Sequence, residues 1–242
     1  MSEQGRPPVV ILCGGRGTRL REHTQEIPKP LVEIGGLPIL WHVIQLYAIH
    51  GFERFLLATG YKGELIAKFA GETSWPDGVA VECVDTGLDT PTGGRIKLLE
   101  SRLSGQERFC ATYADGVARL DLGELLTFHR NHGALATMTV VQPRLQFGVT
   151  EIDASDGRVL GFHEKPRSEH WINGGFFCFE SGVLDYLEAE SVLERDPLER
   201  LAADGQLRAR LHEDFWECMD TYKDAVALND LWESGQAPWR MW

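Results

Sequence analysis

The chain has 242 residues, of which 43% are hydrophobic and 25% are charged, values that are ordinary for a soluble globular protein. Its formal net charge of −12 argues against a general nucleic-acid binder, because such proteins gain affinity by neutralising phosphates. No segment approaches the roughly 18 apolar residues of a membrane span, and the polar N-terminus lacks the apolar region of a signal peptide. We therefore expect a cytoplasmic protein with neither nucleic acid nor a membrane as its partner.

The first predicted element is a buried strand followed by a glycine-rich loop. Residues 9–12 read VVIL, a short run rich in β-branched side chains, and Gly14, Gly15 and Gly17 follow at once. Glycines let the backbone turn tightly and approach a ligand, and the N–H groups of such a loop can hold phosphate oxygens. The loop matches neither the dinucleotide-binding pattern GxGxxG nor the P-loop pattern GxxxxGK(S/T).

Polar and cationic side chains accompany this loop. Thr18 adds a hydroxyl, and Arg19 adds a planar cation suited to bidentate phosphate contact. Lys29 lies between two prolines, which stiffen its backbone. The pattern favours a polyphosphate-binding loop with two positive charges. The loop alone leaves open the alternative of a plain glycine turn with surface cations.

The following segments alternate between helical and strand-like patterns. We expect helices over 38–50, 63–70, 93–103 and 122–132, and strands over 54–60, 79–84, 108–113 and 136–141. Such alternation implies βαβ crossovers and an α/β fold with a Rossmann-like, mostly parallel sheet flanked by helices. Ligands bind such sheets at the carboxyl ends of the strands, which places Gly14 to Arg19 and Asp115 on the same edge.

From Phe147 the pattern changes to that of an antiparallel hairpin. Strand-like segments over 149–152 and 159–162 flank Asp156-Gly157, a two-residue hairpin turn signal. We expect a small antiparallel extension over the sheet. The remaining expected elements are strands over 176–179 and 207–211 and helices near 182–190, 197–203 and 221–233. Thr92 and Gly93 lie where an N-cap of the 93–103 helix would be.

The five cysteines are scattered, odd in number and without a CxxC pair; they are Cys13, Cys83, Cys110, Cys178 and Cys218. A zinc site or a disulfide framework would need closer or paired spacing. We expect reduced core thiols.

The motifs resemble the signature of the sugar-1-phosphate nucleotidyltransferases. The likeness begins with GGRGTRL, PKPLVEIGG and PILWH and continues through GYKGELI, VDTG, TGGRIK, EKP, INGGFF, FWECMDT and APW. Within this family the chain is most similar to the glucose-1-phosphate cytidylyltransferases. The resemblance implies a single nucleotidyltransferase domain over 1–242 with a GT-A-like fold. It also implies a nucleotide-binding core over about 8–142 and a sugar-binding extension with C-terminal elements over about 143–242.

The resemblance implies transfer of a nucleotidyl group from a nucleoside triphosphate to a sugar 1-phosphate, with release of pyrophosphate. CTP and α-D-glucose 1-phosphate are the first choice of substrates, Mg²⁺ the cofactor and a homo-oligomer the assembly. Both reactants are anions, so charge neutralisation and in-line positioning carry most of the catalysis. No protein nucleophile is required, since the attacking oxygen belongs to the substrate.

The resemblance also assigns roles to individual residues. Arg19, Lys29 and Asp115 are the expected catalytic residues, and Asp115 and Asp220 match the family's metal-holding aspartates. The residues expected at the nucleotide are Leu12, Gly14, Gly15, Gly17, Thr18, Arg19, Lys29, Thr90, Thr92, Gly93 and Arg95. Those expected at the sugar phosphate are Glu164, Lys165, Asn173 and Gly174.

Structural alternatives exist for several of these residues. Asp115 fits a turn aspartate before Gly116, and Asp220 fits a helix N-cap before Tyr222. The bland interpretation of Arg95 is a solvated helix residue, and that of Lys165 is an exposed hairpin lysine.

Other functions also stay open at this point. The segment between Ala70 and Asp85 is shorter than in the cytidylyltransferase pattern, which leaves the base preference and the oligomeric state open. The same chemistry with another base, or with another sugar or cyclitol phosphate, is the first alternative. A non-catalytic nucleotide-sensing homologue is the second, although the joint retention of Arg19, Lys29, Asp115 and Asp220 speaks against it.

Overall fold

The computed structural model describes residues 5–17 and 26–242, and a seven-stranded sheet lies at its centre in the order β12-β8-β11-β6-β1-β4-β5. The strands are β1 (Val9–Leu12), β4 (Arg54–Thr59), β5 (Ala80–Asp85), β6 (Arg108–Tyr113), β8 (Ala136–Val141), β11 (Ile172–Glu180) and β12 (Leu207–His212). Only β11 runs against the others, because it pairs antiparallel with β6 and β8 whereas the remaining pairs are parallel. The predicted mostly parallel sheet is confirmed.

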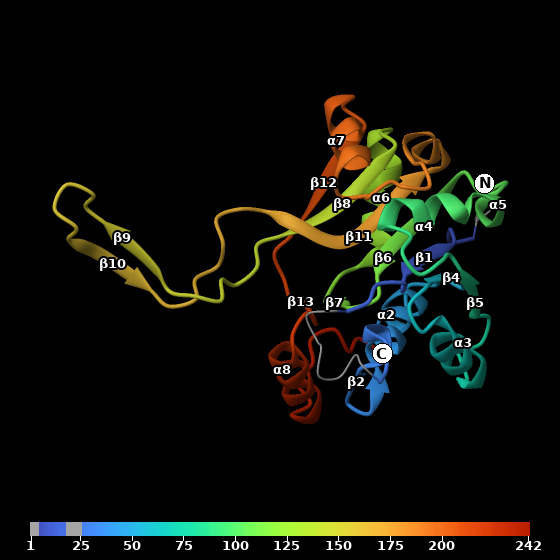
Figure 1. Cartoon of the computed structure of the whole chain (residues 1–242), viewed down its shortest axis with the longest axis horizontal. Helices are drawn as coiled ribbons and strands as arrows, with labels where there is room; N and C mark the ends of the chain where they lie inside the picture. The colour runs from blue at the N-terminus through green and yellow to red at the C-terminus, as the bar shows by residue number, and fades with distance from the viewer. Residues whose placement is uncertain (1–4, 18–25) are drawn as a thin grey trace.

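Helices flank this sheet (Figure 1). They are α2 (Ile39–Ala48), α3 (Gly63–Glu72), α4 (Thr92–Leu98), α5 (Glu100–Leu103), α6 (Leu122–His132), α7 (Asp196–Ala203) and α8 (Tyr222–Glu233), with the 3₁₀ helices η2 (Lys29–Leu31) and η3 (Ser181–Tyr186). The single helix expected over 93–103 is wrong, because the backbone leaves the helical conformation at Leu99. The helix expected near 182–190 is a 3₁₀ helix that ends where Leu187 becomes extended. Across the described ranges, none of the helices is long and apolar enough to cross a membrane.

The core consists of two hydrophobic clusters, and β1 contributes to both. Val9 and Ile11 belong to one cluster, and Val10 and Leu12 belong to the other. Successive side chains of a strand point to opposite faces, so a central strand covered on both sides needs an uninterrupted apolar run. This explains the sequence VVIL at the middle of the sheet.

The direction of chain connections reverses beside β1. From β1 the chain proceeds to β4 and β5 on one side and then returns to β6 on the other side. In register, Leu12 lies opposite Tyr113, so the loops that follow β1 and β6 leave the sheet at the same edge. Such a switch point is where open α/β sheets bind ligands.

The antiparallel extension is a hairpin of β9 (Val149–Ile152) and β10 (Val159–His163), which we call the arm. The extension itself was predicted, but it projects away from the body of the protein rather than lying over the sheet (Figure 1). Strands β11 and β12, which follow the arm in the chain, lie within the central sheet. That arrangement supports the proposal of one domain over the whole chain.

The connection at the tip of the arm is longer than the predicted two-residue turn. It runs from Asp153 to Arg158, and the Asp153 N–H donates to the Arg158 carbonyl over 2.8 Å. The Asp153 carboxylate accepts from the backbone N–H and the hydroxyl of Ser155, at 3.0 Å and 2.6 Å. This local side-chain turn begins the loop before Asp156-Gly157 is reached, which explains the error.

Two further pairs of short strands form separate two-stranded sheets beside the central one. One pairs β2 (Glu33–Ile34) with β3 (Leu37–Pro38), and the other pairs β7 (Gly116–Ala118) with β13 (Trp216–Cys218). The β7–β13 pair joins the turn after β6 to the segment before α8. The two segments lie far apart in the sequence, so local sequence patterns could not predict that they pair.

Candidate active site

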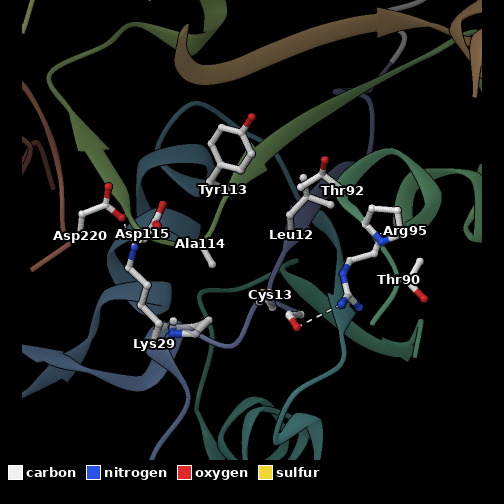
Figure 2. Close-up of a pocket in the computed structure, with 15 residues that line it drawn as sticks. Leu12, Cys13, Lys29, Thr90, Thr92, Arg95, Tyr113, Ala114, Asp115 and Asp220 are labelled. Atoms are coloured by element: carbon white, nitrogen blue, oxygen red, sulfur yellow. Dashed lines mark hydrogen bonds and ion pairs between the residues drawn. The ribbon is translucent and has the colours of Figure 1, made fainter. Parts of the chain in front are cut away.

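A cavity of about 450 Å³ opens at the edge of the sheet where β1 and β6 end. Many residues that the sequence assigned to the nucleotide line it: Leu12, Gly14, Gly15, Gly17, Lys29, Thr90, Thr92 and Arg95, together with Asp115 and Asp220. Figure 2 shows Lys29, Asp115 and Asp220 gathered on one side of this cavity and Arg95 with Thr90 on the other. The predicted residues Thr18 and Arg19 lie outside the described residues.

The two aspartates meet because of the β7–β13 pairing. Gly116 lies opposite Cys218 in this antiparallel pair, and the Met219 N–H donates to the Asp115 carbonyl over 2.9 Å. Asp115 precedes β7 and Asp220 follows β13, so both carboxylates emerge at the same end of the pair. The long-range register, not a local motif, therefore builds this part of the site.

Lys29 supplies the positive charge between the two carboxylates. Its ammonium lies 2.5 Å from Asp115 Oδ2 and 2.6 Å from Asp220 Oδ1, and its side chain is 13% exposed. Burial opposes the charge of Lys29, but the charge and hydrogen bonds of the aspartates outweigh it and raise its pKa. The structure thus holds one cation between two anions at the wall of the cavity.

Asp220 does not cap helix α8, which was the structural alternative to its role as a metal ligand. The N-cap of α8 is Thr221, whose hydroxyl accepts from the Asp224 N–H while the Asp224 carboxylate accepts from the Thr221 N–H. This capping box satisfies the helix end. The Asp220 carboxylate is therefore turned toward Lys29 instead.

Cys218 is a third possible ligand beside the two aspartates. One ligand atom each from Asp115, Cys218 and Asp220 lies within 4.8 Å of the others, close enough to hold a metal ion. Two carboxylates are the hard oxygen donors that Mg²⁺ prefers, so the donor set fits a divalent cation. From the sequence we expected Cys218 to be a core thiol. However, it precedes Asp220 by two residues on an extended segment, and side chains with this spacing can point to the same face of the segment.

Arg95 is buried, so it is not a solvated helix residue. Its guanidinium donates to the carbonyls of Thr59 and Gly87, each at 2.8 Å, and to the Gly14 carbonyl at 3.1 Å. A methyl group on Gly14 would lie 2.0 Å from the guanidinium carbon. Arg95 therefore holds the backbone of the glycine loop in place through its hydrogen bond to the Gly14 carbonyl. A side chain at position 14 would collide with the guanidinium, so the site requires glycine there.

Thr92 and Gly93 do not cap the helix as expected. Pro91 occupies the N-cap position of α4, and the Thr92 hydroxyl donates to Glu194 over 2.6 Å. Gly93 packs against Ser191, whose carbonyl oxygen would lie 2.8 Å from a methyl group placed there. Glycine at this position lets the start of α4 approach the segment around Ser191.

A smaller cavity of about 220 Å³ adjoins the first and contains the predicted sugar residues Asn173 and Gly174. Tyr113, Asp115 and Asp220 line both cavities. The Asn173 amide donates to the Tyr113 hydroxyl over 3.1 Å, and that hydroxyl donates to Glu194. Burial, followed by the Glu194 carboxylate, raises the pKa of Tyr113, so this hydroxyl stays protonated.

Tyr113 and Glu194 were not among the site residues predicted from the sequence. The position of Tyr113 at the end of a strand aligned with β1 was a usable signal. Glu194 follows an irregular segment, and no local pattern indicated it.

Glu164 and Lys165 lie away from the two cavities. They follow β10 directly at the base of the arm, and the Lys165 ammonium lies 3.6 Å from Glu164 Oε1. Their side chains are 63% and 49% exposed, and neither is among the described residues that line the cavities with Asn173. Their assignment to the sugar phosphate stays a prediction.

Two relatives of known name are similar to this chain along almost its whole length. It is 39% identical over 254 aligned positions to a probable glucose-1-phosphate cytidylyltransferase of Bacillus subtilis (strain 168), covering 96% of this chain and 99% of the relative. It is 42% identical over 255 positions to a glucose-1-phosphate cytidylyltransferase of Salmonella typhi, covering 96% and 98%.

The fold has solved counterparts as well. The crystal structure of HddC from Yersinia pseudotuberculosis superposes with a TM-score of 0.74 at 23% identity, covering 93% of this chain and 99% of HddC. The family model described as nucleotidyl transferase matches residues 8–234. With that match and with relatives near 40% identity over almost its whole length, the chain belongs to the nucleotidyl transferase family.

Proposed function

We propose that this protein is a Mg²⁺-dependent glucose-1-phosphate cytidylyltransferase. It transfers a cytidylyl group from CTP to α-D-glucose 1-phosphate, giving CDP-glucose and pyrophosphate. The similarity to two enzymes of that name along nearly the whole chain supports the choice of substrates. The observation that carries the chemistry is the cluster of Lys29, Asp115 and Asp220 at the wall of the larger cavity.

The nucleotide is proposed to bind in the larger cavity. The glycine loop, held in place by Arg95, presents backbone N–H groups to the triphosphate. Lys29 then neutralises charge on the departing pyrophosphate. Because the Lys29 side chain is only 13% exposed, its charge acts in a medium of lower dielectric than water and counts for more.

Asp115 and Asp220 are proposed to hold the Mg²⁺ ion. When bound, the ion neutralises phosphate charge and fixes the phosphates in position. Both carboxylates already surround a cation, the Lys29 ammonium, which shows that their charges face the same point. To contact the triphosphate, the Lys29 ammonium would leave the carboxylates, a movement that its flexible four-carbon stem permits.

The sugar phosphate is proposed to bind in the smaller cavity beside Asn173 and Gly174. One of its phosphate oxygens forms a bond to the α-phosphorus of CTP while the bond from that phosphorus to pyrophosphate breaks. Tyr113 lines both cavities, and we place the new bond close to it, where the two cavities adjoin. Glu164 and Lys165 would join this subsite if the segment between β10 and β11 closes over it.

The reaction is tested by measuring pyrophosphate release with Mg²⁺ and glucose 1-phosphate in the presence of CTP, UTP, dTTP, GTP or ATP. Release with CTP and formation of CDP-glucose are expected. Release with a different nucleotide alone would contradict the cytidylyl assignment and keep the family chemistry. If none of the five nucleotides gave pyrophosphate with glucose 1-phosphate, but pyrophosphate was released with another sugar or cyclitol phosphate, the choice of glucose 1-phosphate would be contradicted.

We also propose a homo-oligomer that covers the arm. Exposed large apolar side chains gather on and next to it: Phe147 (80% exposed), Ile152 (60%), Val159 (60%), Leu160 (60%) and Phe162 (62%). A two-stranded hairpin is marginally stable alone, and an apolar patch of this kind marks an interaction surface. A second copy of the chain is the occupant we propose.

Light scattering after size exclusion tests this assembly. The wild-type chain should run as an oligomer, and Ile152→Ser with Phe162→Ser should shift it to a smaller species. Leu98→Ser, which changes an exposed leucine on α4, is the control and should leave the mass unchanged. A monomeric wild-type chain would contradict the proposal.

A further inference from the structure

We propose that Cys218 is a third ligand of the Asp115–Asp220 metal site and gives this site affinity for soft divalent cations such as Zn²⁺ and Cd²⁺. Cys218 lines the smaller cavity together with both aspartates. The inference rests on the proposed position of the metal, but it does not depend on which substrates the enzyme uses.

The spacing of the three donor atoms fits a compact metal ion. In a tetrahedral site with Zn–S near 2.3 Å and Zn–O near 2.1 Å, sulfur and oxygen lie about 3.6 Å apart. The donors of Asp115, Cys218 and Asp220 already lie within 4.8 Å of one another. Small side-chain rotations close that difference, and the paired backbone of β7 and β13 need not move.

The backbone leaves the thiol accessible to such an ion. Gly116 lies opposite Cys218 in the β7–β13 pair, so no cross-strand side chain covers the sulfur. The thiol is half-buried at the cavity wall, unlike the fully buried Cys13, Cys110 and Cys178. Cys218 therefore differs from the core thiols that the sequence led us to expect.

A positive charge already occupies the space between the two carboxylates. The Lys29 ammonium lies 2.5 Å and 2.6 Å from them. An ion of charge +2 in the same space gains more attraction from Asp115 and Asp220, and the flexible stem of Lys29 allows it to withdraw.

Sulfur decides which ions gain from the third ligand. Thiolates favour soft or borderline cations, whereas carboxylates suit Mg²⁺, so sulfur adds affinity for Zn²⁺ and Cd²⁺ only. The bond from sulfur to the metal replaces the bond from sulfur to its proton, which leaves to the solvent. Soft cations and Mg²⁺ would thus compete for one place.

The test is a titration of the metal-free, full-length protein with Cd²⁺, followed by the ultraviolet charge-transfer absorption of a Cd²⁺–thiolate bond. The band should form in the wild type and fade when excess Mg²⁺ is added. Cys218→Ser should lose the band and bind Cd²⁺ about tenfold more weakly or worse by calorimetry. Cys83→Ser, which removes the other half-buried thiol, is the matched control and should keep both.

An unchanged band in Cys218→Ser, or no band in the wild type, would overturn the proposal. A band that Mg²⁺ does not affect would also overturn it, because the sulfur would then belong to a different site. Circular dichroism checks the fold, and Cys218→Ala replaces the serine variant if that one is unfolded. A band in a protein that lacks cytidylyl transfer would refute the proposed function and leave the role of Cys218 standing.

Discussion

Glu194 accepts a hydrogen bond from the Tyr113 hydroxyl, which lies between the two cavities of the candidate active site. The same carboxylate accepts from the Thr92 hydroxyl over 2.6 Å on the nucleotide side. On the sugar side, the Asn173 amide donates to Tyr113 over 3.1 Å. One carboxylate therefore links residues proposed to contact both substrates.

Replacing Glu194 should weaken the reaction because its two acceptor oxygens hold two hydroxyls. In Glu194→Gln one oxygen becomes an amide donor, so Thr92 and Tyr113 cannot both donate to it. Hydrogen bonds to charged groups contribute about 1.5–3 kcal/mol, so kcat/KM should fall about tenfold or more. Glu190→Gln, an exposed glutamate of the same segment, is the control, and an equal effect in both variants would refute the linking role.

Gly14→Ala should destabilise the glycine loop. The added methyl group would lie 2.0 Å from the Arg95 guanidinium carbon, which must then leave its carbonyl partners. Overpacking of this kind costs about 1–3 kcal/mol, which thermal unfolding detects as a lower Tm. Gly15→Ala has no heavy atom within 4 Å of its added carbon and should melt near the wild-type temperature. Equal Tm values for the two variants would contradict the supporting role of Arg95.

Much of the fold could be predicted from local patterns. The strands Arg108–Tyr113 and Ala136–Val141 and the helix Leu122–His132 match the expected limits residue for residue. In these segments hydrophobic periodicity and end signals agree, since Asp121 caps the helix and Gly133 follows it in the left-handed conformation. Where a local side-chain turn competed, as at Asp153, the expected loop was wrong.

The candidate site was less accessible to sequence reasoning. The meeting of Asp115 and Asp220 depends on the register of β7 against β13, which no local window contains. Family resemblance supplied those two aspartates. The spacing of Cys218 from Asp220 was a weak signal that was not used, and Glu194 was recognised only in the structure. The direction of the arm was likewise unpredictable, because periodicity fixes which residues pair but not where a hairpin points.

His42 should make the stability of the protein depend on pH. It is fully buried, its Nε2 donates to the Ile34 carbonyl over 2.8 Å, and its Nδ1 accepts from the Trp239 indole over 3.4 Å. Burial lowers the pKa of His42 to about 4 from its ordinary value of 6.5. As pH falls below that ordinary value, the unfolded state binds the proton first, so stability is lost between about pH 6.5 and 4.

Urea unfolding at pH 7.5 and pH 5 measures this loss. The free energy of unfolding should fall at the lower pH in the wild type and fall less in His42→Gln. His129, whose pKa burial also lowers to about 4, acts in the same direction, so the variant should keep part of the decrease. An identical decrease in both proteins would exclude His42 as a source.

Lys29→Met should make the protein more responsive to Mg²⁺. The substitution leaves the Asp115 and Asp220 carboxylates facing each other without the ammonium that now lies between them. The metal-free variant should have a lower Tm, and Mg²⁺ should raise that Tm by more than it raises the wild-type value. Lys62→Met, outside the cluster, is the control. A smaller Mg²⁺ response in Lys29→Met would show that the two carboxylates do not hold the ion.

The role of Asp115 as a metal ligand in nucleotidyl transfer is tested by pyrophosphate release from CTP and glucose 1-phosphate with Mg²⁺, compared between the wild type and Asp115→Asn. Loss of a metal ligand should cost several kcal/mol of transition-state stabilisation, so the rate should fall at least about a hundredfold. Asp77→Asn, an exposed aspartate elsewhere, should keep the wild-type rate, and circular dichroism should show all three proteins folded. Unchanged turnover in folded Asp115→Asn would remove Asp115 from the metal site and contradict the account of how this cavity works.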